Sequence, residues 1–567
     1  MTGSPQPDRQ PDWVRWYPDG LGATIDVRHP SMLHLWRDAV DRQGEEVACL
    51  FFDAELSYAR LDRDADALAA ALVRGGLRPG ERVGILLQND PQWLVALLAT
   101  WKAGAVAVSL SPMMRPSELR FQLDDAAVAV LICLDTLYRD VAAHALDSST
   151  VRRTLVTDAG DWLDGTPRPE LLGAGGVEVG VRGVEGVEAP ERLLDVVAAA
   201  AGAQPPAVDL GPDDVAVLTY TSGTTGPPKG AMLTHGGISH NAQLAAQWFG
   251  LGAGDPILAM APLFHVTGLV LHLGISWYAG GSVILGHRFD PRQILDSVER
   301  RRPVMVIAAI TAFIALLEEG SLGRRDLSSL RVVLSGGAPV TVGVVDRFEA
   351  LTGLRISPVY GLTETSSPSH LVPPGVAAPV DAETGVLSVG VPVPGCRVDV
   401  FDLVTGEPLG PGEAGELAIS GPMVVPGYWG RPDESAAAIP GGRLLTGDVG
   451  LRDEAGWFFV VDRRKDLIIA SGYKVWPREV EEVLHTHPAV SEAAVVGQPD
   501  PYRGETVVAY VVPVAGVDLG EAELVAYCRE RLASYKYPRT VHIVETIPKT
   551  GSGKVLRRTL RALGTAP

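Results

Sequence analysis

The chain has 567 residues, which is too many for one hydrophobic core, so we expect more than one domain. Its composition, 46% hydrophobic and 21% charged, is ordinary for a folded globular protein. The formal net charge of −19 argues against nonspecific nucleic-acid binding, because a phosphate backbone requires a basic surface. A local nucleotide pocket remains compatible with this charge.

The first 450 or so residues alternate short β-branched runs with longer helical patterns. Residues 82–87 predict a buried strand, residues 91–103 a helix, and residues 105–110 the next strand. This alternation favours α/β layers with a largely parallel sheet. A Gly/Val/Glu-rich segment at 173–190 has little periodicity, and we expect a surface loop there.

The sequence also indicates the compartment. The cysteines Cys49, Cys133, Cys396 and Cys528 share no CxxC spacing, and we expect reduced, buried thiols. The amino-terminal residues do not resemble a signal peptide, and the longest apolar run, 303–317, falls short of the ~20 residues that span a bilayer. That run predicts a buried strand followed by a helix. We therefore expect a cytoplasmic protein without a membrane span.

The last hundred residues have a different pattern. A helix is predicted after Pro477, strands at 490–496 and 506–514, and a second helix at about 520–533, which together make a small α+β module. The charged run 462–466 separates this module from the rest, and its composition alone indicates a solvated linker. We expect an N-terminal domain of residues 1–462 and a C-terminal domain of residues 463–567.

The strongest chemical signal is the loop at 220–230, which follows an apolar strand and precedes a helix that begins near His235. It contains four serine and threonine residues, three glycines and Lys229. Glycines let backbone N–H groups approach an anion, and the hydroxyls and the lysine add donors and charge, so the loop suits a polyphosphate. It is not a Walker loop, because Pro228 precedes the lysine. Residues 551–554 do not form a Walker loop either, because Val555, and not a serine or threonine, follows Lys554.

The loop at 220–230 resembles the signature of the adenylate-forming superfamily, which includes acyl-CoA synthetases, peptide-synthetase adenylation domains and firefly luciferase. Further motifs of that superfamily follow in the expected order, at 262–268, 360–365, 446–448, 462–472 and 548–554. The chain is identified as a member of the acyl-CoA synthetase branch. The resemblance implies a large N-terminal α/β domain with mixed sheets, which binds ATP and the acid, and a small, mobile α+β C-terminal domain.

The resemblance also assigns roles to residues. Lys554 would stabilise the charge that develops while the acid attacks ATP, and Glu364 would hold Mg²⁺, for which a carboxylate is a suitable hard ligand. Tyr360 would stack on adenine, while Asp448 and Arg463 would bind the ribose. The other implied catalytic residues are Thr221, Lys229 and His265, and the other implied nucleotide-binding residues are Ser222, Gly223, Thr224, Thr225, Gly336, Gly337, Ala338, Gly361 and Thr363.

Two further residues belong to the implied domain motion. In the family the C-terminal domain rotates between adenylation and thioester formation, and Lys465 matches the hinge. One orientation would bring in Lys554, and the other would bring Gly472 beside the pantetheine tunnel of coenzyme A (CoA). A glycine suits that place, since a side chain would obstruct the thiol.

The substrate is expected to be a hydrophobic acid. Amino-acid activators place an aspartate near the position of His265, whereas this chain has no acidic residue between Ala261 and Val283. The implied acyl-pocket wall is small or apolar, and 466–481 is similar to bacterial medium- and long-chain fatty acyl-CoA synthetases. Fatty, aryl and terpenoid acids all remain open. The wall consists of His265, Val266, Thr267, Ile310, Thr311, Ser335, Gly336, Gly337 and Ala338.

The expected reaction is ATP-dependent formation of an acyl-AMP with release of pyrophosphate, followed by transfer to CoA. An alternative is an acyl-AMP ligase that loads a separate carrier protein. A second alternative, a nucleotide- or acyl-binding relic, predicts a broken motif, yet Lys229, Glu364, Asp448, Arg463 and Lys554 are all present. The protein is expected to act as a monomer or homodimer, with ATP, Mg²⁺ and CoA as its cofactors.

Overall fold

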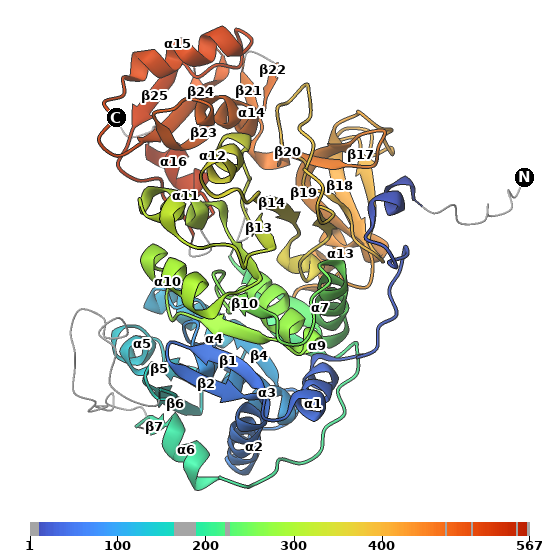
Figure 1. Ribbon diagram of the computed structural model, residues 1–567, viewed down its shortest axis with the longest axis vertical. Helices are drawn as coiled ribbons and strands as arrows, with labels where there is room; N and C mark the ends of the chain where they lie inside the picture. Colours follow the sequence, from blue (N-terminus) through green and yellow to red (C-terminus); the bar gives the residue numbers. More distant parts are fainter. Residues whose placement is uncertain are drawn as a thin grey trace, which may run out of the picture.

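The computed structural model describes residues 11–163, 189–221, 227–470, 473–500, 503–550 and 554–563. Figure 1 shows the sheets of the first 390 residues in the lower and middle parts of the molecule, the strands β17–β20 at one side, and the C-terminal residues at the top. Most of the expected loop at 173–190, as well as Ser222, Gly223, Thr224, Thr225 and Gly472, lies outside the described residues.

A largely parallel sheet has the order β7-β6-β5-β3-β4-β8-β9, in which only the pair β8 and β9 is antiparallel. All seven residues of β5 are buried, as expected for a strand covered on both faces. The predicted strands and helix at 82–110 are confirmed as β3, α3 (Pro91–Lys102) and β4. The strands are β3 (Arg82–Leu86), β4 (Val106–Ser109), β5 (Val128–Leu134), β6 (Arg153–Thr157), β7 (Glu191–Arg192), β8 (Val215–Thr221) and β9 (Lys229–Thr234).

A second, mixed sheet has the order β16-β15-β14-β13-β12-β10-β11-β1-β2, with antiparallel pairs at both ends. The prediction for 303–317 is confirmed, since β12 runs into α11 (Ile310–Glu318). The strands are β1 (Val47–Phe51), β2 (Ala54–Ser57), β10 (Pro256–Leu258), β11 (Ser282–Leu285), β12 (Met305–Ala308), β13 (Val332–Gly336), β14 (Ser357–Tyr360), β15 (His370–Leu371) and β16 (Val391–Pro392).

A third sheet is antiparallel and consists of β17 (Arg397–Phe401), β18 (Gly415–Ser420), β19 (Arg443–Arg452) and β20 (Phe458–Arg463). Its register places Asp448 of β19 opposite Arg463 of β20. Two motifs separated in the sequence therefore meet on neighbouring strands.

Helices cover these sheets, and all twelve residues of α3 are buried, so this helix is enclosed on every side. No helix among the described residues is long and apolar enough to cross a membrane. All four cysteines are free and buried, as predicted. The remaining helices before residue 463 are α1 (Met32–Gln43), α2 (Tyr58–Arg74), α4 (Pro116–Asp125), α5 (Asp135–Asp140), α6 (Leu193–Ala199), α7 (His235–Trp248), α8 (Val266–Gly268), α9 (Ile275–Ala279), α10 (Pro291–Arg301), α12 (Val342–Thr352) and α13 (Pro432–Ala438).

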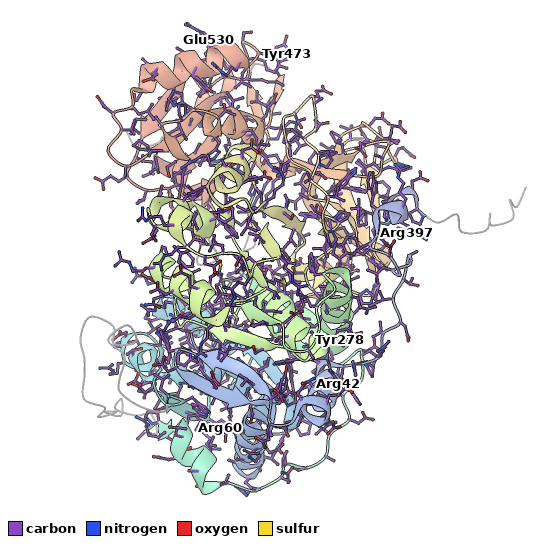
Figure 2. All side chains as sticks on the ribbon, viewed as in Figure 1. Arg42, Arg60, Tyr278, Arg397, Tyr473 and Glu530 are labelled. Atoms are coloured by element: carbon purple, nitrogen blue, oxygen red, sulfur yellow. The ribbon has the colours of Figure 1, made fainter. Side chains whose placement is uncertain are left out.

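The C-terminal residues form a separate α+β unit with hydrophobic cores of its own. Tyr473 and Glu530 mark its outer end (Figure 2). The predicted strand at 490–496 continues to Asp500, because β23 pairs with β24 along its whole length. The division at 462/463 stays a prediction. The elements are β21 (Ile468–Ala470), β22 (Tyr473–Val475), β23 (Val490–Asp500), β24 (Gly504–Pro513), β25 (Thr540–Ile543), α14 (Pro477–His485), α15 (Glu521–Arg531) and α16 (Arg557–Leu563).

The interpretation of 462–466 as a solvated linker is wrong for two of its carboxylates. Asp462 and Asp466 are only 5% and 4% exposed. Both accept hydrogen bonds from Arg557 of α16, at 3.5 and 3.3 Å, and Arg557 also makes a bidentate pair with Glu481 at 2.8 Å. The arginine stands more than 90 positions later in the chain, so the local sequence does not reveal this pairing.

Candidate active site

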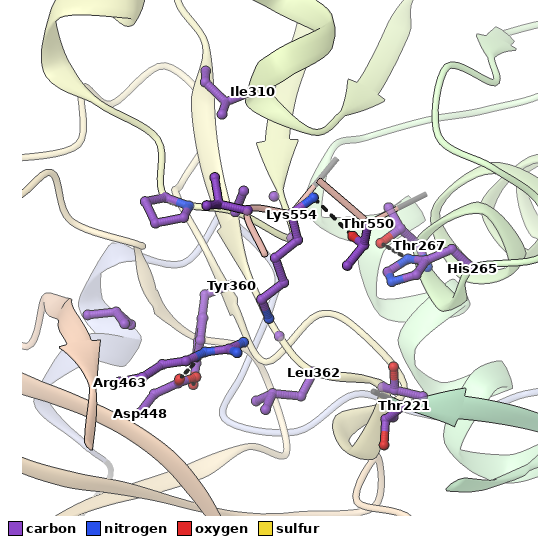
Figure 3. Close-up of a pocket in the computed structure, with 18 of the residues that line it drawn as sticks. Thr221, His265, Thr267, Ile310, Tyr360, Leu362, Asp448, Arg463, Thr550 and Lys554 are labelled. Atoms are coloured by element: carbon purple, nitrogen blue, oxygen red, sulfur yellow. Dashed lines mark hydrogen bonds and ion pairs between the residues drawn. The ribbon is translucent and has the colours of Figure 1, made fainter. Parts of the chain in front are cut away.

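A cleft of about 970 Å³ lies between the N-terminal sheets and the C-terminal unit. Side chains from both parts line it, and Figure 3 shows how they converge. Among the residues that line it are most of those predicted from the sequence: Thr221, Lys229, His265, Val266, Thr267, Ile310, Thr311, Gly336, Gly337, Ala338, Tyr360, Gly361, Thr363, Glu364, Asp448, Arg463, Lys465 and Lys554.

One end of the cleft is built by Tyr360, Asp448 and Arg463. The Tyr360 hydroxyl donates a 2.8 Å hydrogen bond to Asp448, and the Arg463 Nε lies 3.4 Å from the other carboxylate oxygen. Burial raises the pKa of Asp448, while Arg463 and the tyrosine hydroxyl oppose that shift. A carboxylate and a fixed aromatic ring next to a cationic side chain suit the hydroxyls and base of a nucleoside.

The predicted phosphate loop begins and ends in antiparallel strands, with Thr221 of β8 paired with Lys229 of β9. The Lys229 ammonium lies 4.0 Å from Glu434 and 5.3 Å from the centre of the Tyr428 ring. It therefore presents a positive charge where the loop closes. Such a charge beside a glycine- and hydroxyl-rich loop suits polyphosphate binding.

Glu364 lies on the short turn η5 (Thr363–Thr365) that follows β14, and it is 9% exposed. Burial raises the pKa of its carboxyl, and the Tyr428 hydroxyl donates to it at 2.9 Å. Among the described residues, no cluster of three His, Cys, Asp or Glu side chains could hold a metal ion. A single carboxylate fits Mg²⁺, which is commonly bound by one or two carboxylates together with substrate phosphates.

The buried amide of Asn241 on α7 holds the turn after Glu364. It donates to the carbonyl oxygens of Thr365 and Ser366 at 3.1 and 3.0 Å. Ser366 has a positive φ of 48°, a conformation that non-glycine residues rarely adopt without support. Asn241 thus fixes the backbone next to the acidic side chain.

The other end of the cleft is apolar around His265. Thr267 donates its backbone N–H to His265 Nδ1 at 3.3 Å, and its hydroxyl lies 3.1 Å from the same nitrogen. Because Nδ1 accepts, the neutral ring carries its proton on Nε2. Burial lowers the pKa of His265 to about 4, so the ring is neutral at physiological pH. Val266, Ile310 and Gly337 also line the cleft, and their role as the wall of an acyl pocket stays a prediction.

Ser335 is an exception among the predicted wall residues. It is completely buried in β13 and does not line the cleft, whereas its neighbours Gly336 and Gly337 do. Successive residues of a strand point to opposite faces, so this serine faces the interior. The prediction for Ser335 is therefore wrong.

Asn89 holds the backbone of the segment that carries His265. Its amide donates to the carbonyl oxygens of Ala259 and Ala261 at 3.2 and 3.1 Å, and its oxygen accepts from Leu263 N–H at 2.8 Å. The Ser109 hydroxyl also donates to the Phe264 carbonyl. These contacts join residues more than 150 positions apart, which explains why the sequence did not indicate them.

The C-terminal unit places Lys554 inside the cleft. Lys554 N–H donates to the Thr550 hydroxyl at 3.1 Å, and Thr550 N–H donates to the Lys554 carbonyl at 2.7 Å. From this anchored backbone the side chain extends toward Leu362, between the Tyr360 and Thr221 ends of the cleft (Figure 3). An ammonium group there can approach groups bound at either end.

Lys465 also lines the cleft, and it lies on the turn η7 (Arg464–Asp466). Burial is the largest influence on its ammonium and lowers its pKa. Tyr473, the described neighbour of Gly472, is 57% exposed at the far end of the C-terminal unit and is not a lining residue. The structure therefore brings Lys554, and not the segment around Tyr473, to the cleft.

Comparison with known proteins assigns this arrangement to a family. The model of the AMP-binding enzymes matches residues 36–429, and that of the AMP-binding enzyme C-terminal domain matches residues 479–554. The chain belongs to the AMP-binding enzyme family. The sequence-based identification is confirmed, and this AMP-binding enzyme is an AMP-forming acid–thiol ligase of the acyl-CoA synthetase branch, with ATP, Mg²⁺ and CoA as cofactors.

Two curated relatives of this AMP-binding enzyme span nearly its whole length. It is 36% identical to a long-chain-fatty-acid–CoA ligase of Bacillus subtilis (strain 168), over 97% of this chain and 98% of the relative. It is 38% identical to a feruloyl-CoA synthase of Amycolatopsis, over 89% and 93% of the two chains.

Solved structures show the same fold. The anthranilate CoA ligase AuaEII in complex with anthranoyl-AMP superimposes with a TM-score of 0.82, at 26% identity over 95% of this chain and 98% of the other. The ATP-bound MatB of Rhodopseudomonas palustris gives a TM-score of 0.80, at 30% identity over 94% and 98%. The expected α/β fold with mixed sheets and a smaller C-terminal unit is thus confirmed.

Proposed function

We propose that this enzyme activates a hydrophobic carboxylic acid with ATP in the cleft as it stands, and then passes the acyl group to CoA. The observation that carries the proposal is the placement of Lys554 in one cleft together with Tyr360, Asp448 and the ends of the phosphate loop. The acid, the triphosphate of ATP and the ammonium group of Lys554 can meet there without any rearrangement of the N-terminal sheets.

In the first step a carboxylate oxygen of the acid attacks the α-phosphorus of ATP, and pyrophosphate leaves. Asp448 and Arg463 hold the nucleoside, and Lys229 faces the departing phosphates. The Lys554 ammonium, placed between the two ends of the cleft, stabilises the negative charge that develops around the α-phosphate. Mg²⁺, when bound at Glu364, neutralises phosphate charge.

In the second step the CoA thiol loses its proton and attacks the acyl carbon, so that AMP leaves. We propose that the C-terminal unit, residues 463–567, turns about Lys465 between the two steps, withdrawing Lys554 and bringing the segment around Gly472 to the cleft. The present position of Tyr473 at the outer end of that unit supports two separate working orientations.

The acid is proposed to be a fatty or an aryl acid. Val266, Ile310 and Ile314 offer an apolar surface, and the neutral His265 ring adds no charge that would have to be desolvated. The named relatives include both a long-chain-fatty-acid–CoA ligase and a feruloyl-CoA synthase. We further propose a cytoplasmic location, which supplies ATP and CoA and keeps the four buried thiols reduced.

The test is pyrophosphate release from ATP and Mg²⁺ with a panel of fatty, aryl and terpenoid acids, each with and without CoA, followed by mass spectrometry of the products. Acid-dependent release with acyl-CoA as product is the expected result. Adenylate without acyl-CoA would favour the alternative in which a carrier protein is the acceptor. An absence of turnover with every acid would contradict the proposal.

A further inference from the structure

The N-terminal sheets and the C-terminal unit touch closely where helix α12 meets helix α14. A Cβ atom built on Gly343 of α12 would lie 2.8 Å from the carbonyl oxygen of His485 at the end of α14. Real Cβ atoms essentially never approach a backbone atom so closely. The two helices are therefore as near as a residue without a side chain permits.

Arg478 of α14 stabilises this contact. It is 4% exposed, and its guanidinium donates to the carbonyl oxygens of Val460 and, at 3.3 Å, of Val340. Its backbone N–H donates to Asp462 at 2.9 Å. A planar guanidinium is well suited to grip two carbonyl groups at once, and here both belong to the N-terminal part of the chain.

Glu482, one helical turn further along α14, contacts both Arg478 and the N-terminal part of the chain. It lies 3.5 Å from the Arg478 Nε and accepts from Val342 N–H at 3.4 Å. Arg478 and Glu482 thus hold the peptide groups on both sides of Thr341. Since both side chains are less than 10% exposed, water does not compete for these contacts.

The segment that they hold is the end of the loop 336–341. Every residue of this loop lines the cleft, and Gly337 within it has a φ of 76°, which a residue with a side chain rarely adopts. The position of the cleft wall is therefore tied to the position of the C-terminal unit.

We infer that Arg478, Glu482 and Gly343 form a dock that holds the loop 336–341 for adenylation and releases it when the C-terminal unit turns. Arg478 lines the cleft, but the side-chain contacts of Arg478 and Glu482 are with each other and with backbone groups, so we assign them a positioning role. Gly343 permits the close approach of α12 and α14. The inference rests on the proposed function, namely two half-reactions in two orientations. It predicts that weakening the dock slows acyl-AMP formation and spares thioester formation.

The decisive variant is Gly343→Ala. The added methyl group favours the helix by about 1 kcal/mol relative to glycine, so it does not weaken α12 itself. It clashes with His485 only while α14 is docked. Arg478→Met is the second variant, since it keeps much of the side-chain volume but removes the donors. Gly252→Ala is the matched control, because a Cβ there would meet nothing within 4 Å.

Each protein is assayed for both half-reactions with an acid that the wild type accepts. Pyrophosphate release is followed without CoA, and acyl-CoA formation is followed from synthetic acyl-AMP and CoA. We expect Gly343→Ala and Arg478→Met to slow the first reaction by about 10- to 100-fold, the scale of a misplaced reacting geometry, and to leave the second within about twofold. Gly252→Ala should match the wild type in both.

Equal slowing of both half-reactions, or no slowing of the first in Gly343→Ala, would overturn the inference. Failure of the proposed function would look different, because the wild type itself would then fail to form acyl-AMP or acyl-CoA. Thermal unfolding of each variant identifies a folding defect, and Gly343→Ala alone decides the question if Arg478→Met does not fold.

Discussion

Tyr428 connects two charged side chains of the active site that stand far apart in the sequence. Its hydroxyl donates to Glu364 at 2.9 Å, and its ring lies 5.3 Å from the Lys229 ammonium. The tyrosine stands outside the motifs from which the site was predicted, and only the fold shows its role. It donates to the acidic group and places its ring beside the basic one.

Tyr428→Phe should raise the Mg²⁺ concentration needed for half-maximal pyrophosphate release, because Glu364 loses the donor that orients it. A hydrogen bond to a charged group contributes about 1.5–3 kcal/mol, so a shift of about tenfold or more is expected. Tyr428→Leu should have a larger effect, since it also removes the ring beside Lys229. A Mg²⁺ titration identical to that of the wild type would show that Tyr428 does not orient Glu364.

At the scale of elements, the segment 259–265 depends on a side chain from another strand–helix unit. Asn89 follows β3 and satisfies two carbonyl groups and one N–H group of this segment. The backbone conformation of the motif that carries His265 is therefore fixed by a residue outside the motif. Within the motif, Thr267 contacts the His265 ring, and the His265 N–H donates to the Pro262 carbonyl.

Asn89→Ala leaves three backbone groups without their partner, and each such buried group costs about 1–3 kcal/mol. We expect a lower Tm and a rise in KM for the acid that exceeds the rise in KM for ATP, because the loosened segment lines the acyl end. Asn89→Asp keeps an acceptor for Leu263 N–H but places a carboxylate oxygen against the carbonyl oxygens of Ala259 and Ala261, so it should be no milder than Asn89→Ala. Equal changes in both KM values would indicate a general loss of structure instead.

The elements themselves were predictable where their pattern was local. The apolar run of β3, the helix α3 and the strand–helix pair β12–α11 all follow from periodicity within about fifteen residues. The motif residues of the cleft were predictable because they resemble a known family. Asn89, Asn241, Tyr428 and Arg557 were not, since each acts through a contact with a distant segment. The orientation of the Ser335 side chain toward the interior was not predictable either, because it depends on how β13 is placed in its sheet.

For the whole molecule, the junction of the two parts contains buried carboxyl groups that respond to pH. Burial raises the pKa of Glu482 to about 7, against an ordinary value of 4.5, although Arg478 opposes the shift. A carboxyl whose pKa is raised by folding stabilises the folded state at low pH. This contribution is complete below pH 4.5 and is lost as the pH rises through 7.

The difference between the two pKa values of Glu482 corresponds to about 3 kcal/mol of free energy of unfolding. Of this contribution, about 1 kcal/mol remains at pH 6 and almost none at pH 8.5. Glu482→Gln removes the titrating group, so the fall in Tm between pH 6 and pH 8.5 should be smaller in the variant than in the wild type. Glu530→Gln, at an exposed glutamate of α15, should leave the fall unchanged. If Glu482→Gln shows the same fall as the wild type, the buried carboxyl does not titrate as described.

In the proposed mechanism, the docked C-terminal unit supplies Lys554 for adenylation and for that step alone. The most direct measurement compares Lys554→Ala with the wild type in the two half-reactions. We predict that pyrophosphate release from ATP and the acid falls by about 100-fold or more, while acyl-CoA formation from synthetic acyl-AMP stays close to the wild-type rate. An unchanged rate of pyrophosphate release, or an equal loss in both half-reactions, would contradict the assignment of Lys554 to this cleft.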